Sequence, residues 1–121
     1  MATFTSVQSG LWNLGTTWGA TGSTKGIDWP GNTGDVVNIG PSAGQAHRVT
    51  YNVSETNELG QITVGAVSGA SYSELYFSRS TSSLLTMGHA DILIRQTGIL
   101  DMGTSADMIP SSYTAKITIL R

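Results

Sequence analysis

Histidines and carboxylates are the residues of this chain whose chemistry could support metal binding. His89 and Asp91 are two positions apart, so in a strand they would lie on one face and could share a metal ion. His47 is the other histidine, and a structural zinc site normally takes about four ligands. Cysteine is absent, which removes disulfides, thiolate catalysis and thiolate-bound zinc. We therefore predict no metal site and no cofactor.

Aspartates are the candidates for polysaccharide cleavage, but they are scattered along the chain. A hydrolase would need two carboxyl groups facing each other across about 5 to 9.5 Å, and no spacing in the sequence points to such a pair. Asp35 and Asp107 stand beside residues that favour turns. The motifs G-x-S-x-G and H-E-x-x-H and the Walker loop are absent. We predict that the protein has no catalytic residues and is not an enzyme; a degenerate polysaccharide-cleaving enzyme that depends on Asp101 is a remote alternative.

Aromatic residues provide the remaining candidate chemistry. All three tryptophans, Trp12, Trp18 and Trp29, lie in the first part of the chain, which is rich in glycine and turn-forming residues. One interpretation is a cap that covers the end of a β-structure. The other is a platform on which a sugar stacks, because indole and phenol faces suit amphipathic ligands. The candidates for such stacking are Trp12, Trp18 and Tyr76.

The composition indicates what kind of elements must position these residues. The chain has 121 residues, of which only 12% are charged, with 15 glycines and many serines and threonines. Glycine, serine and threonine are poor helix formers, so the composition favours strands and turns. The net charge of −2 gives no basic surface for nucleic acid or an anionic membrane. No apolar run approaches the roughly 18 residues of a membrane span, and the first residues do not resemble a secretory signal.

Short alternations of apolar and polar residues predict strands with one buried face. A unit of aliphatic, polar, aliphatic and glycine residues recurs at irregular intervals, and each closing glycine would permit a positive-φ corner. The units span Asp35–Gly40, Gly60–Gly65, Ser83–Gly88 and Gly98–Gly103. Further alternating runs span His47–Val53, Glu74–Ser78, Asp91–Arg95 and Lys116–Leu120.

This arrangement predicts an all-β fold built as a single-stranded β-helix or β-solenoid, in which each coil buries its apolar side against the next. The tryptophan-rich segment would form its N-terminal cap. A β-sandwich of hairpins is the alternative. We expect an extended N-terminal arm over residues 1–9 and one all-β domain over residues 10–121.

The order of several short motifs resembles a known family. Paired tryptophans precede Gly-Asp-Val-Val-Asn-Ile, His-Arg-Val-Thr-Tyr-Asn-Val, Leu-Gly-Gln-Ile-Thr-Val-Gly and Gly-Ile-Leu-Asp-Met-Gly. Over residues 10 to 120 this order resembles the extracellular domain family named for its eight glycines, a glycine-rich β module that often opens right-handed β-helix proteins. The resemblance implies a surface or secreted setting and binding of carbohydrate or another ligand. A short copy without a secretory signal also resembles the β-helical modules of phage structural proteins, such as capsid decoration or tail components.

The two ends of the chain are the candidate contact segments. Phe4 and Val7 belong to the expected arm, and Lys116, Ile117 and Ile119 belong to the expected final strand. A strand with a free edge must be blocked or paired, and pairing with a neighbouring subunit would satisfy it. The alternative is that the final strand lies inside its own sheet.

Together these observations predict a structural module of a phage virion, made in the host cytoplasm, that acts through protein–protein contacts. Its partners would be protein subunits in a homo-oligomer or in a capsid or tail lattice, with neither nucleic acid nor membrane involved. The alternative is a carbohydrate-binding module of an extracellular or cell-surface β-helix protein, with a glycan as its ligand.

Overall fold

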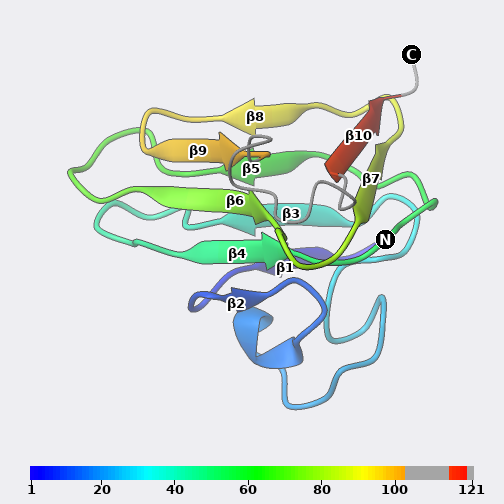
Figure 1. Cartoon of the computed structure of the whole chain (residues 1–121). Helices are drawn as coiled ribbons and strands as arrows, with labels where there is room; N and C mark the ends of the chain where they lie inside the picture. Colours follow the sequence, from blue (N-terminus) through cyan, green and yellow to red (C-terminus); the bar gives the residue numbers. More distant parts are fainter. Residues whose placement is uncertain (103–114, 120–121) are drawn as a thin grey trace.

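The computed structural model describes residues 1–102 and 115–119, which consist of strands, turns and one short 3-10 helix, η1 (Gly15–Trp18) (Figure 1). The structure is mostly β, which confirms the all-β prediction. No helix in the described part of the chain is long and apolar enough to cross a membrane.

The strands form three sheets, which are not closed. The first sheet has the order β1 (Thr3–Thr5), β3 (Val36–Ile39), β5 (Ile62–Val64) and β8 (Ile92–Ile94). The second has the order β2 (Gly10–Leu11), β4 (Arg48–Tyr51), β6 (Ser73–Phe77) and β9 (Gly98–Asp101). The third pairs β7 (Ser83–Met87) with β10 (Ala115–Ile119).

Every pairing between these named strands is parallel, and successive strands of the chain alternate between the first two sheets up to β6. A sandwich built from hairpins would instead pair consecutive strands in antiparallel fashion. The parallel order therefore does not fit the β-sandwich alternative. In Figure 1, the sheets run from β1 and β2 near the bottom to β8 and β9 near the top.

Parallel register places like side chains above one another, so that apolar residues form columns through the core. Val37 is paired with Ile62, and Ile62 with Ile92. In the second sheet Leu75 is paired with Val49 on one side. Alternation within each strand points one set of side chains inward. The core is therefore continuous from sheet to sheet and from layer to layer.

An aromatic column runs through this core from the β1 and β2 end. The rings of Trp12 and Tyr51 are 4.8 Å apart, and those of Tyr51 and Phe77 are 5.1 Å apart. Trp18 packs edge-on against Trp12 at 5.4 Å, and Phe4 packs against Trp18 at 6.3 Å. Each such ring pair adds about 0.5–1.5 kcal/mol beyond the area that it buries. These ring contacts therefore hold β1 and β2 in place, although the two strands are short.

Each of the four copies of the recurring aliphatic and glycine unit forms a strand, but the four strands do not all belong to the same sheet. β3 and β5 lie in the first sheet, whereas β7 lies in the third and β9 in the second. Positive φ is confirmed at Gly40 (55°) and Gly65 (88°). Gly88 does not have a positive φ, and Gly103 lies outside the described residues.

The N-terminal segment contains a short strand, but it is not an arm separate from the sheets. β1 pairs with β3, with Phe4 opposite Val37. The amide of Ala2 also donates to Asp35 Oδ1 at 2.9 Å. The segment is therefore the edge strand of the first sheet.

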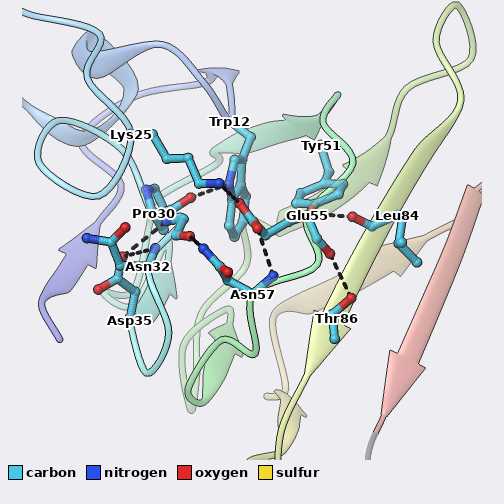
Figure 2. A network of polar contacts seen from close by, with 11 residues as sticks. Trp12, Lys25, Pro30, Asn32, Asp35, Tyr51, Glu55, Asn57, Leu84 and Thr86 are labelled. Carbon is cyan, nitrogen blue, oxygen red and sulfur yellow. Dashed lines mark hydrogen bonds and ion pairs between the residues drawn. The ribbon is translucent and has the colours of Figure 1, made fainter.

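Two buried carboxylates hold the long loop of residues 19–34 against the sheets (Figure 2). Asp35 accepts hydrogen bonds from the amides of Gly31 (3.1 Å) and Asn32 (2.8 Å) as well as from Ala2, so its predicted role in a turn is confirmed. Glu55 lies 2.7 Å from Lys25 Nζ and also accepts the amide of Asn57 at 2.8 Å. Because buried charge is costly unless paired, these partners are what permit both carboxylates to lie in the interior.

Candidate assembly surface

The last layer of the three sheets, β8, β9 and β10, forms the candidate site. In the described part of the chain each of these strands pairs on one side only, with β5, β6 and β7. We call their free edges, with the side chains that they carry, the open end. A free edge presents unpaired N–H and C=O groups, which favour pairing with another strand.

Burial changes abruptly between the last layer and the one beneath it. Ile94 is 39% exposed, whereas Val64, its partner in register, is 0% exposed. Ile119 is 42% exposed, whereas its partner Met87 is 0% exposed. The same contrast holds for three further partly exposed residues whose partners are fully buried: Ile92, Leu100 and Ile117. The apolar columns of the core thus reach the surface at the open end.

The open end also carries outward-facing apolar side chains and little charge. Leu93 and Ile99 are exposed on β8 and β9. The charged residues of the three strands are Asp101, whose Oδ1 is 3.0 Å from Arg79 Nη2, and Lys116. Natural proteins usually protect free edges with lysine, proline or inward-pointing charge, and β8 has none of these. A free strand edge that carries exposed apolar side chains is a site at which another strand can pair.

At the opposite end of the sheets the core is filled by aromatic side chains, although β1 pairs on one side only there; we call it the closed end. Trp12 and Trp18 are buried there, and η1 lies beside β2. The indole N–H of Trp12 donates to Pro30 O at 2.9 Å, and that of Trp18 donates to Trp12 O at 2.8 Å. The amide of Val7 donates to Thr17 O at 2.9 Å. The two ends therefore differ in what they offer to another molecule.

The predicted contact residues are divided between these two ends. Lys116, Ile117 and Ile119 lie in β10 at the open end. Phe4 lies in the protein's own core, which corrects its prediction as a partner contact, because its ring is needed against Trp18. Val7 is exposed, but it lies at the closed end.

The predicted sugar-stacking residues do not form a platform. Trp12 and Trp18 are correctly expected to lie near the start of the sheets, but their faces are covered by other rings, so the prediction that they stack on a sugar is wrong. The guanidinium carbons of Arg48 and Arg79 each lie 4.3 Å from the ring centroid of Tyr76. These cation–π contacts already occupy the Tyr76 ring.

A polar cluster that sequence reasoning missed joins three strands at one corner. Ser6 Oγ lies 2.7 Å from His47 Nδ1 and accepts the amide of Gly40 at 2.9 Å. Burial lowers the pKa of His47, because desolvation disfavours the charged imidazole. Ser6 is fully buried, so this pair fixes the ends of β1 and β3 to the start of β4 and offers no exposed nucleophile. Its members are far apart in the sequence, and no local pattern signals their contact.

In the described residues, no three side chains of histidine, aspartate or glutamate lie close enough together to hold a metal ion. No family model, no curated protein and no solved structure matches the chain. The function must therefore be argued from the geometry of the open end.

Proposed function

We propose that the protein is a non-enzymatic structural module, a short parallel β-helix that joins another protein subunit through its open end. The observation that carries this proposal is the contrast between the exposed apolar residues of the last layer and their fully buried partners beneath. An interior column that ends in solvent is completed when another protein covers it.

The β-helix interpretation is supported by the path of the chain between the sheets. From β5 the chain passes through β6 and β7 before β8 returns to the side of β5. Parallel bridges from Ser54 to Leu84 and from Leu59 to Met87 extend the third side to the preceding coil. Each coil would then bury its apolar face against the next, as in other repeat architectures.

The exposed apolar surface of the open end contributes to association when a partner covers it. Full burial of an aliphatic side chain is worth about 1.5–3 kcal/mol, so each residue that is some 40% exposed offers about 1 kcal/mol. The four such residues are Leu93, Ile94, Ile99 and Ile119. Loss of translational and rotational freedom opposes binding, so main-chain pairing along the free edges must add to this apolar term.

The setting that we propose is a virion shell or tail. The low charge of the chain and its resemblance to short β-helical phage modules support this setting, since interface cores are depleted in charge. Glycan binding has less support, because the rings of Trp12 and Trp18 face the core.

Site-specific photo-crosslinking tests whether the open end contacts protein. A photoreactive phenylalanine analogue is placed at Leu93 or Ile99, and at Ile27 as the control, because Ile27 is 74% exposed and lies in the 19–34 loop. The proteins are produced in the cells from which the chain comes, and crosslinked peptides are identified by mass spectrometry. We expect defined protein partners from Leu93 and Ile99 and only background from Ile27. Equal yields at all three positions, or none, would refute the proposal.

A further inference from the structure

We propose that the partner at the open end is a second copy of this chain, joined through antiparallel pairing of the two β8 strands about a two-fold axis at Leu93. This inference rests on the proposed function, because it names the protein that the open end binds. Three observations support it. They are the sequence of β8 with the residues on either side of it, the hydrogen bonds that hold this segment on β5, and the difference between the open and closed ends.

The segment Asp91–Arg95 is complementary to itself when one strand is reversed against another. Antiparallel pairing centred on Leu93 places Asp91 of each copy opposite Arg95 of the other. It also places Ile92 of each copy opposite Ile94 of the other. Opposite charges and apolar residues that face each other across strands are favourable pairs, whereas facing like charges are unfavourable.

This segment is already held in strand geometry on its inner side. The amide of Ile62 donates to Asp91 O at 3.0 Å, and the amide of Arg95 donates to Val64 O at 2.9 Å. β8 is thereby fixed to β5 over its whole length, with Asp91 and Arg95 both exposed at its two ends. The pairing therefore requires no rearrangement of the backbone.

A two-fold axis normal to the first sheet also keeps the interiors of both copies on the same side of that sheet. Ile92 and Ile94 point inward, as their partners Ile62 and Val64 do, so the apolar columns would continue from one copy into the other. The pair Asp91 and Arg95 carries no net charge, and Asp101 is already paired with Arg79. The β8 edges of two copies can therefore approach each other without like-charge repulsion; Lys116, the other charged residue of the last layer, lies on β10 in a different sheet.

The closed end limits what this contact can build. Trp12 and Trp18 complete the core at the β1 and β2 end and η1 lies beside β2, so the core columns that reach the surface at the open end have no counterpart there for head-to-tail stacking. An isologous contact uses the same patch on both copies and closes the assembly. The expected product is a dimer rather than a filament.

Charge reversal tests the proposed pairing and its direction. In a homodimer of the Asp91→Lys variant, each introduced lysine would face Arg95 of the other copy. In a homodimer of Arg95→Glu, each introduced glutamate would face Asp91. We expect each variant alone to dimerise about tenfold more weakly than the unmodified chain, as measured by sedimentation velocity over a concentration series. A mixture of the two variants pairs opposite charges at both positions, and we expect it to form a heterodimer with near-normal affinity.

Two further variants complete the test. Leu93→Lys would place two like charges at the axis and should abolish the dimer, whereas Glu58→Lys reverses an exposed charge outside the Asp91–Arg95 segment, beside Gly88, and should leave it intact. Circular dichroism establishes that each variant is folded. A chain that stays monomeric at about 100 µM, or a dimer that does not respond to these changes, overturns the second copy as partner. Crosslinks from Leu93 to a different protein would then still support the proposed function, and their absence would refute it as well.

Discussion

Replacing Asp35 with asparagine is expected to lower the free energy of unfolding by about 3 kcal/mol. The Asp35 carboxylate is buried and accepts three amides: Oδ1 accepts that of Ala2, and Oδ2 accepts those of Gly31 and Asn32. Asparagine has one acceptor oxygen and one NH2 group at these positions. Whichever way the amide is turned, its NH2 group faces at least one N–H donor.

The magnitude follows from these contacts. A hydrogen bond to a charged group contributes about 1.5–3 kcal/mol, and a buried donor left without an acceptor costs about 1–3 kcal/mol. The side chain of asparagine keeps one or two of the three bonds in weaker, neutral form, which leaves a net loss of about 3 kcal/mol. Asp28→Asn is the matched control, because Asp28 accepts the exposed amide of Thr24 at 2.8 Å and its loss should cost less than about 1 kcal/mol.

Urea unfolding followed by circular dichroism measures both variants, with the slope of the transition fitted separately from the midpoint. Hydrogen exchange adds a local readout, because the amides of Gly31 and Asn32 should lose protection in Asp35→Asn and keep it in Asp28→Asn. A stability of Asp35→Asn within about 0.5 kcal/mol of the unmodified chain, comparable to the error of the extrapolation, would refute the role assigned to the buried carboxylate.

Two further predictions concern the corners of the sheets. Because burial lowers the pKa of His47, the folded state prefers the neutral imidazole; this contribution to stability is complete above the ordinary value of 6.5 and is lost as the pH falls below it. Urea midpoints at about pH 7.5 and about pH 5 should therefore differ less in His47→Gln than in the unmodified chain, and an unchanged difference would contradict this assignment. Gly65→Ala should destabilise the protein by more than about 3 kcal/mol, because a Cβ there would collide with the backbone of Gly98 at a positive φ. Gly44→Ala is its control, since Gly44 has a similar φ of 87° but open space around it. We expect the free energy of unfolding of Gly44→Ala, measured by thermal unfolding, to fall by only about 1 kcal/mol.

The strands could be predicted from the sequence because alternation is a local signal. Val49 and Tyr51 alternate with polar residues in the sequence, and both point into the core of the structure. Alternation does not encode which sheet a strand joins, and for this reason β3 and β9 carry similar sequences but lie in different sheets. The contact of Ser6 with His47 likewise joins residues that are 41 positions apart in the sequence, which no local pattern records.

The candidate site required the structure for a related reason. Ile62 and Ile92 are both aliphatic residues in short alternating runs, and the sequence treats them alike. Only the register shows that Ile62 lies between two neighbours, Val37 and Ile92, whereas Ile92 has one among the described residues. Exposure at the open end is thus a property of position in the stack and not of residue type.

Under the proposed function, the difference between the two ends also determines what kind of assembly the chain can form. A parallel sheet with two equivalent free edges would stack head to tail without limit, which is the hazard of exposed strand edges. Here the rings of Phe4, Trp12 and Trp18 complete the core at one end, so that a copy added there could continue the core only if these rings left their apolar contacts. Displacing one large buried aromatic side chain costs about 3–5 kcal/mol, which exceeds the gain from covering a few partly exposed aliphatic residues. Under the proposed dimer, the closed end therefore makes a finite assembly the more stable outcome.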